Sequence, residues 1–197
     1  MTTEWSNWSG SQHHQAQKVL APESEEELIN LLSKARGESR CIRTIGSAHS
    51  FVPFWTDDYL VSLDNMKGFI AFDQERLQAT VHAGTKLHEL GEPLWEHGMS
   101  MQNMGDIDRQ SVAGAISTGT HGTGVSLKNI SSQVVGIRLL TAAGEVQEIR
   151  EGDVDLFRAA QVSMGSLGII TQLTLQLMPR YYMHEKNWQA KIGRAHV

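Results

Sequence analysis

The spacing of apolar and polar positions predicts short strands and helices in mixed order. Apolar runs predict strands at 17–21, 41–45, 59–63 and 169–177. Alternating positions predict two hairpins, which pair 69–72 with 77–82 and 133–141 with 145–150. Helical spacing predicts helices at 24–37, 86–97 and 111–117, and a fourth that begins at Asp153 and includes Ala160. Elements mixed in this way favour an α+β fold over alternating βα units.

Local signals mark the N-terminal part of the chain. Ser24, followed three residues later by Glu27, forms a capping box, and we expect the helix that it starts to end at Gly37. Two tryptophans, Trp5 and Trp8, stand too close to the N-terminus to belong to an ordinary core. We expect them to pack on a part of the fold that forms later in the chain.

Composition and charge exclude several classes of protein. With 197 residues, 40% of them hydrophobic, the chain can bury a core as one large domain or two small ones. The net charge of −5, without a basic run, argues against nucleic acid or an anionic membrane surface as a partner. No apolar stretch has the length of a membrane-spanning helix, and the N-terminus lacks the apolar segment of a signal peptide. We therefore expect a soluble, cytoplasmic protein without membrane association.

The residues that commonly bind metals do not form a recognisable metal site. The single cysteine, Cys41, excludes an internal disulfide and the cysteine-based zinc and iron–sulfur clusters. Its apolar run predicts a buried thiol rather than a reactive one. His82, His88 and His97 fit no helical i, i+4 pair, and no acidic ligand is placed to join them. We expect no metal.

The most informative stretch joins a strand to a loop of small residues. The strand at 41–45 leads into Gly46, Ser47 and Ala48, where small side chains leave successive backbone N–H groups uncovered. Such a loop can hold an anion, above all a phosphate, and His49 would point at whatever the loop holds. A turn with a surface histidine explains this short stretch equally well when it is taken alone.

A second segment, 105–124, favours ligand binding. It carries five glycines among serines and threonines, which expose N–H groups and hydroxyls with little bulk. The short helix predicted at 111–117 would direct its N-terminus at an anion. A flexible linker is the alternative, but a linker would not carry the apolar residues Ile107, Val112 and Ile116. We favour a packed loop that faces a ligand.

Familiar nucleotide-binding and hydrolase motifs are absent. The chain has no G-x-G-x-x-G after a strand and no G-x-x-x-x-G-K-[ST]. It has no G-x-S-x-G elbow either, because Met164 occupies the first position of the nearest match, 164–168. The features left to explain are the two loops of small residues and His49. They indicate a protein that binds a phosphorylated cofactor, and they do not specify its reaction.

Three motifs in the same order resemble the FAD-binding domain of the vanillyl-alcohol oxidase superfamily. They are RTIGSAHS at 43–50, the segment 111–124 with TGTHG at 118–122, and GSLGI at 165–169. The match is closest to the sugar-lactone and alditol oxidases, which include gulonolactone, arabinonolactone and xylitol/sorbitol oxidases. Residues 5–10, WSNWSG, are similar to the N-terminal Asn-Trp motif of that branch. The resemblance covers the chain to about Arg180.

The resemblance implies an α+β fold of the PCMH type, in which two α+β subdomains hold FAD between them. The FAD-binding domain would occupy residues 1–180, and residues 181–191 would begin a truncated substrate (cap) domain. Residues 192–197 look foreign to the family and are expected to be a non-native tail. Catalytic residues that contact the substrate are expected in the cap domain, and none is assigned to this chain.

The resemblance also implies a cofactor site. Residues 43–50 would form the pyrophosphate loop, and the second loop would line the pyrophosphate and the flavin ring. His49 matches the histidine that this branch bonds covalently to the flavin, and neutral imidazole is a competent nucleophile near pH 7. The implied FAD-binding residues are Arg43, Thr44, Ile45, Gly46, Ser47, Ala48, His49, Ser50, Gly105, Asp106, Ser111, Gly114, Ser117, Thr118, Gly119 and Ile169.

The implied reaction is hydride transfer from a sugar lactone or alditol to FAD, followed by reduction of O2 to H2O2. Gly105 falls where a small residue in this family is thought to admit oxygen, which favours an oxidase. One alternative is a dehydrogenase of the same family that uses another electron acceptor. The other is a non-catalytic nucleotide-binding module in which His49 is a plain polar contact.

One position departs from the family pattern. The residue immediately before the histidine is usually glycine, and here it is Ala48. If this position needs a positive φ, alanine costs on the order of 1 kcal/mol there.

Overall fold

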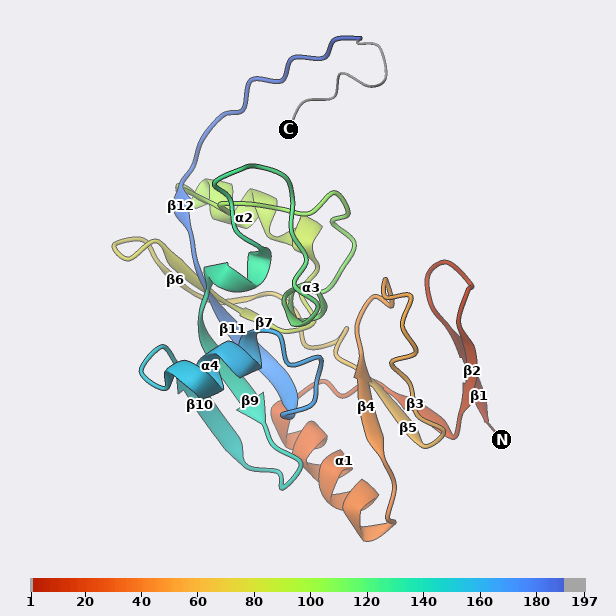
Figure 1. The fold of residues 1–197 in the computed structure, drawn as a ribbon. Helices are drawn as coiled ribbons and strands as arrows, with labels where there is room; N and C mark the ends of the chain where they lie inside the picture. Colours follow the sequence, from red (N-terminus) through yellow and green to blue (C-terminus); the bar gives the residue numbers. More distant parts are fainter. Residues whose placement is uncertain (1, 190–197) are drawn as a thin grey trace.

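Two β-sheets of different kinds form the two main parts of the fold (Figure 1). The computed structural model describes residues 2–189. The first part, within residues 18–62, contains a three-stranded parallel sheet in the order β3–β5–β4, and the second part, within residues 69–176, contains a five-stranded antiparallel sheet in the order β10–β9–β11–β7–β6. The α+β class and the two-subdomain arrangement predicted from the sequence are confirmed.

The parallel sheet is built by a strand–helix–strand unit. Its elements are β3 (Lys18–Leu20), α1 (Glu25–Gly37), β4 (Ile42–Ile45) and β5 (Tyr59–Ser62). As predicted, Ser24 caps α1, because its side-chain oxygen accepts a hydrogen bond from the N–H of Glu27 at 3.2 Å. Gly37 is the last helical residue, but the left-handed conformation falls on Ser39, at φ 52°.

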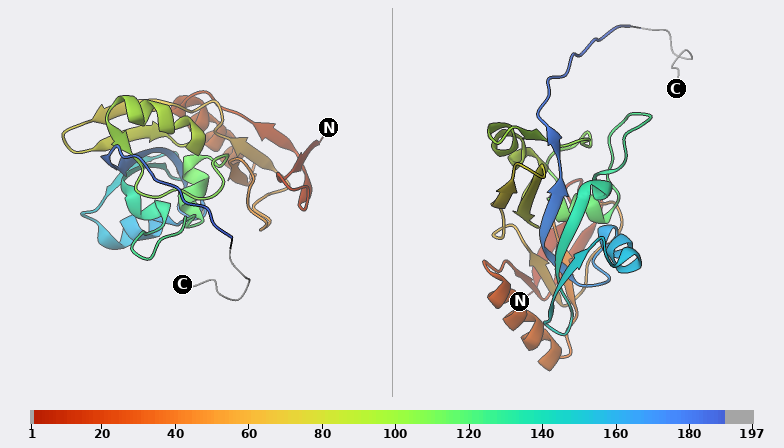
Figure 2. Two further views of the ribbon diagram at one scale, coloured as in Figure 1. Left: turned by 90° about the horizontal axis from the view of Figure 1, so that it is seen from above. Right: turned by 90° about the vertical axis from the view of Figure 1, so that its left-hand side faces the viewer.

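The antiparallel sheet carries the larger part of the core. Its strands are β6 (Phe69–Asp73), β7 (Gln78–His82), β9 (Val134–Leu140), β10 (Val146–Arg150) and β11 (Ile169–Gln176). Alternate apolar residues such as Val81, Ile137 and Leu173 are buried. Helix α4 (Val154–Gln161), which Asp153 caps as predicted, lies beside the β9–β10 edge (Figure 2). Both predicted hairpins are present.

The connections between strands differ from the predictions in places. The helix predicted at 86–97 is divided into a 3-10 helix η1 (Leu87–Glu89) and α2 (Gly91–Glu96). Helix α3 (Val112–Ser117) is present as predicted, and a 3-10 helix η2 (Ile130–Gln133) precedes β9. Two strands that were not predicted, β8 (Met99–Ser100) and β12 (Met178–Pro179), pair with each other.

An N-terminal hairpin was also missed, although its tryptophans behave as expected. β1 (Thr3–Ser6) and β2 (His13–Ala16) pair antiparallel. The Trp8 ring packs on His49 and Phe51, with ring centroids 5.1 and 6.2 Å apart respectively. The short, polar strands of this hairpin carry no apolar alternation that would identify them in the sequence.

The prediction of a buried thiol at Cys41 is wrong. Cys41 is exposed, because it precedes β4, which is an edge strand of the three-stranded sheet. Only its backbone is engaged, and its N–H donates to the Asp58 carboxylate at 2.8 Å. Within residues 2–189, no helix has the length and apolar character needed to cross a bilayer.

A polar cluster joins the two main parts of the fold. The Arg138 guanidinium on β9 donates to the Glu25 carboxylate in the first turn of α1, from Nε at 2.9 Å and from Nη2 at 2.8 Å. The Thr171 hydroxyl on β11 donates to the same carboxylate at 2.6 Å, and Arg138 also pairs with Glu148. The hydrogen bond from Arg138 is the main cause that lowers the pKa of Glu25.

We expect Glu25→Gln to lower the free energy of unfolding by about 1–3 kcal/mol at pH 7, because it removes a charge-assisted pairing. The folded-state pKa of Glu25 lies below its ordinary value of 4.5, so its contribution is full above that value and is lost as the pH falls through the folded pKa. Urea unfolding at pH 7 and in acid should therefore show a difference between the two proteins that shrinks in acid. Glu26→Gln, an exposed neighbour in the same helical turn, is the control. An equal effect from both substitutions would contradict the pairing.

Candidate cofactor-binding site

A cavity of about 420 Å³ lies where the loop after β4 meets α3. All of the residues predicted to bind FAD line this cavity, except Gly105, Asp106 and Gly119. The predicted residues that line it are 43–50, Ser111, Gly114, Ser117, Thr118 and Ile169. The fold therefore brings most of the predicted FAD-binding residues together, although they lie between positions 43 and 169 of the sequence.

Other lining residues were not identified from the sequence. They include Trp5 from the N-terminal hairpin, Asp64 after β5, Ala83 and Gly84 after β7, Gln110 before α3, and Met164 in the turn before β11. Most are apolar or small, so neither their type nor their spacing separates them from ordinary core residues. Trp5 is the exception, since its position near the N-terminus signalled a contact with a later part of the chain.

The two small-residue loops touch at Gly46 and Ser111. A Cβ atom added at Gly46 would lie 2.4 Å from Ser111 Oγ, and one added at Gly114 would lie 3.0 Å from the same oxygen. Ser111 is buried, with 4% of its surface exposed. A side chain at residue 46 would require the Ser111 hydroxyl to move, whereas glycine lets the loops meet with this hydroxyl in place.

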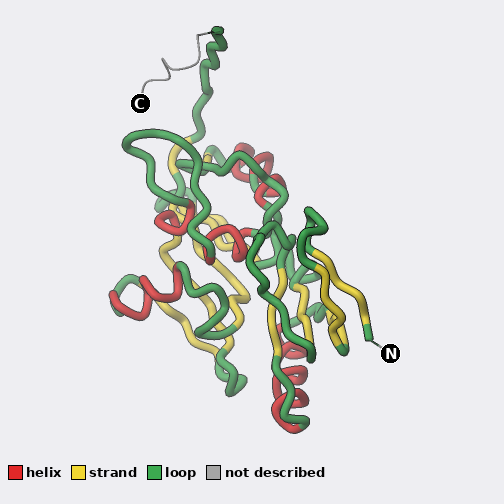
Figure 3. Tube along the Cα trace, turned by 45° about the vertical axis from the view of Figure 1, so that its right-hand side comes forward, coloured by secondary structure: helices red, strands yellow, loops and turns green. Residues whose placement is uncertain are grey.

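The backbone of the first loop is left free for a ligand. Within residues 2–189, no main-chain N–H of residues 46–50 donates a hydrogen bond to a protein acceptor. Their carbonyls are used instead: Trp8 N–H donates to Ala48 O at 3.1 Å, and the Asn7 side-chain amide donates to Ser50 O at 3.1 Å. The N-terminal hairpin lies beside this loop (Figure 3), and its turn residues Asn7 and Trp8 bond to the loop carbonyls. The uncommitted N–H groups suit an anionic ligand.

Helix α3 contributes less to anion binding than its position suggests. The N–H groups of Val112 and Ala113 in its first turn donate to the carbonyls of Thr85 and Ala83, at 2.8 and 3.2 Å. These bonds fix α3 against the segment after β7, and they remove two of the donors that an anion would use at a helix N-terminus. The anion-binding capacity therefore resides mainly in the loop at 46–50.

Ala48 adopts the left-handed conformation, with φ at 55°. Because residue 48 needs a positive φ, alanine destabilises the loop by a free energy on the order of 1 kcal/mol relative to glycine. The contacts from Asn7 and Trp8 hold the loop in this conformation.

His49 lies in an environment that keeps its ring neutral. The imidazole stacks on Trp8 at an interplanar angle of 25° and lines the cavity. Partial burial is the main cause that lowers its pKa from the ordinary value of 6.5, and the positive charge of Lys86 lowers that pKa further. The neutral form, which is the nucleophilic one, therefore predominates at pH 7.

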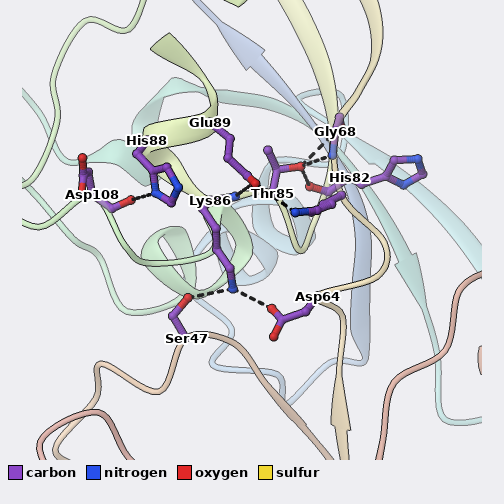
Figure 4. A network of polar contacts seen from close by, with 10 residues as sticks. Ser47, Asp64, Gly68, His82, Thr85, Lys86, His88, Glu89 and Asp108 are labelled. Carbon is purple, nitrogen blue, oxygen red and sulfur yellow. Dashed lines mark hydrogen bonds and ion pairs between the residues drawn. The ribbon is translucent and has the colours of Figure 1, made fainter. Parts of the chain in front are cut away.

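Lys86 connects the two loops, and no feature of the sequence identified it. Its Nζ donates to Ser47 Oγ at 2.9 Å and to Asp64 Oδ1 at 2.6 Å (Figure 4). Its main chain forms an isolated β-bridge with Ser111. A lysine at the start of a predicted helix is expected to be solvated, so only the folded chain reveals this role.

His88 and His97, two of the three histidines considered as metal ligands, make separate contacts. His97 stacks on Phe72, and the His88 ring nitrogen lies 3.1 Å from the carbonyl of Asp108. Among the described residues, no group of three or more histidine, cysteine, aspartate or glutamate side chains is arranged to hold a metal ion.

Comparison with known proteins identifies the family. The FAD-binding domain family matches residues 16–150. The chain belongs to this family. The resemblance stated from the sequence motifs is thereby confirmed, and the domain described above is a FAD-binding domain.

Relatives of this FAD-binding domain are named as lactone enzymes. The L-gulono-1,4-lactone dehydrogenase of Mycobacterium tuberculosis is 38% identical over 98% of this chain and 45% of its own length. The D-arabinono-1,4-lactone oxidase of Eremothecium gossypii is 36% identical over 90% of this chain and 35% of its own length. The chain thus spans less than half the length of these relatives.

Solved structures share the fold of this FAD-binding domain. Cholesterol oxidase from B. sterolicum has a TM-score of 0.79 at 17% identity, covering 91% of this chain and 37% of that chain. Alkyldihydroxyacetonephosphate synthase has a TM-score of 0.74 at 21% identity, covering 84% of this chain and 32% of that chain.

The contact between the loops can be tested by a double-mutant cycle. We expect Gly46→Ala to lower the free energy of unfolding by about 1–3 kcal/mol, because the new methyl group collides with Ser111 Oγ. In the Ser111→Ala background the same methyl group would face only the Ser111 Cβ position at 3.5 Å, which is an ordinary contact. Denaturant unfolding of the four proteins should show that Ser111→Ala relieves most of the cost. Simple additivity of the two substitutions would show that the cost of Gly46→Ala does not come from a collision with Ser111 Oγ.

Proposed function

We propose that this chain is the FAD domain of a flavin-dependent sugar-lactone oxidase. The proposal rests mainly on the main-chain N–H groups of residues 46–50, which donate to no protein acceptor within residues 2–189. These residues, His49 among them, line the cavity, and Gly46 contacts the second loop at Ser111. A row of free N–H groups suits a pyrophosphate. The names of the relatives support a lactone as the substrate of the whole protein.

The residues present fit the cofactor. Gly46, Ser47 and Ala48 offer backbone donors without bulk, so a diphosphate can approach the chain closely. Arg43 lines the same cavity and brings a positive charge to it, and its guanidinium lies 5.3 Å from the centre of the Phe54 ring. When bound, FAD would supply the hydride acceptor for oxidation of a sugar C–H.

The predicted FAD-binding residues outside the first loop fall into two groups. Ser111, Gly114, Ser117 and Thr118 would line the cofactor from the α3 side, and Ile169 would meet it from β11. Gly105, Asp106 and Gly119 do not line the cavity, so their role in FAD binding stays a prediction. The cytoplasmic location also stays a prediction from the sequence.

His49 is proposed to bond covalently to the flavin. Its place in the cavity, its neutral ring and the Trp8 ring stacked on it support this role, because the stack limits the orientations of the imidazole. Covalent attachment would hold the cofactor even where single contacts are weak.

A dehydrogenase that uses another electron acceptor is the second candidate. The relatives from Mycobacterium tuberculosis carry that name, whereas those from Eremothecium gossypii and Bos taurus are named oxidases. Rapid reoxidation of the reduced, FAD-loaded protein by air would support the oxidase. Reduced protein that is stable in air would favour the dehydrogenase.

The covalent bond can be tested by acid denaturation of the purified protein. We expect yellow flavin to stay with the precipitated wild-type polypeptide, and His49→Ala to release it while FAD still binds before denaturation, because the loop donors remain. Absorbance near 450 nm in pellet and supernatant is the measurement. His13→Ala, an exposed histidine of β2, is the control and should behave as wild type. Retention of flavin by His49→Ala would contradict the assignment, and a wild-type protein that binds no FAD would favour a module without flavin chemistry.

A further inference from the structure

Lys86 occupies a position between the two loops that form the cavity, although it does not line the cavity itself. Its side chain is largely buried, with 19% of its surface exposed. A buried ammonium group is retained only where acceptors compensate for the lost water, and here Ser47 Oγ and the Asp64 carboxylate do so at 2.9 and 2.6 Å. The first of these acceptors belongs to the 46–50 loop.

The main chain around Lys86 holds the second loop. Lys86 forms the β-bridge with Ser111, and the neighbouring N–H groups of Leu87 and His88 donate to Gln110 O and Asp108 O, each at 3.0 Å. One residue therefore contacts the first loop through its side chain and the second loop through its backbone.

The segment that carries Lys86 is itself fixed in place. The Thr85 hydroxyl is buried, accepts from Gly68 N–H at 2.9 Å and donates to His82 O at 2.7 Å (Figure 4). The Glu89 carboxylate accepts from the Lys86 N–H at 2.8 Å, and this bond is the main cause that lowers the pKa of Glu89. Lys86 thus extends from a segment held by several hydrogen bonds toward a loop whose own N–H groups donate to no acceptor within residues 2–189.

We propose that Lys86 is a positioning residue that fixes the 46–50 loop relative to Ser111 and thereby shapes the cavity for FAD. This inference rests on the proposed function. Asp64 balances the lysine charge, so the pair adds rigidity without placing an uncompensated cation beside the cavity. The same ammonium lowers the pKa of His49, which links the position of the loop to the protonation of its histidine.

Two readouts on the full 197-residue chain test this role. The first is the FAD dissociation constant, measured by quenching of free FAD fluorescence in the His49→Ala background, where binding is reversible. We expect Lys86→Gln to raise that constant about tenfold, because a charge-assisted hydrogen bond to the loop is lost, and Lys86→Arg to restore most of the affinity. Lys67→Gln removes the same charge at an exposed ion pair with Glu89 and should leave the constant unchanged.

The second readout is the NMR titration of His49 in the FAD-free chain with His49 intact. Lys86→Gln should move the midpoint upward, because the lysine charge that lowers the pKa of His49 is gone. Ser47→Ala removes the tether but keeps the charge, so it should weaken FAD binding while the His49 midpoint stays low. If Lys86 only stabilised the fold, Lys86→Gln would weaken FAD binding without raising the His49 midpoint.

The outcomes separate this inference from the proposed function. Wild-type affinity and an unchanged His49 midpoint in Lys86→Gln would overturn the role of Lys86. If Lys86→Gln does not fold, Lys86→Met, which keeps the aliphatic stem and lacks the charge, takes its place: reduced FAD affinity together with a raised His49 midpoint supports the role, and wild-type values of both overturn it. A wild-type chain that binds no FAD would defeat the proposed function, whereas the titration of His49 would still decide whether Lys86 acts on the loop.

Discussion

The close approach of Gly46 to the hydroxyl of Ser111 is the contact at which the two loops of the site meet. A side chain at residue 46 would enter the space of that oxygen, with a Cβ only 2.4 Å away. The contact brings a loop from the parallel sheet against a helix that is anchored beside the antiparallel sheet. The free N–H groups of residues 46–50 and the small residues of α3 therefore line one cavity.

Three separate parts of the fold hold this contact in place. The N-terminal hairpin binds the carbonyls of Ala48 and Ser50, so the donors of the loop stay free. Lys86 bonds to Ser47 and pairs with Ser111 through its backbone. Farther away, the cluster of Glu25, Arg138 and Thr171 joins α1 to the antiparallel sheet. The strain at Ala48 is tolerated because these supports determine the loop conformation.

Local sequence patterns predicted most elements of the fold, whereas contacts between distant segments stayed hidden. The capping residues Ser24 and Asp153 and the two hairpins were read correctly, because their signals lie within a few residues of one another. The hairpin at β1–β2 was missed because its strands are short and polar, and Cys41 was misjudged because an apolar run does not reveal that its strand lies at an edge. The loops of the site were recognised by their small residues, but Lys86 was not, since a single lysine carries no pattern.

The central claim is that the two loops bind one ligand together. The most direct measurement is a backbone amide NMR spectrum of the His49→Ala chain, in which FAD binding is reversible, during titration with FAD. The account predicts that amide signals of residues 46–50 and of residues 111–118 shift together, with one common dissociation constant. Shifts confined to one of the two segments, or separate constants for each, would contradict it.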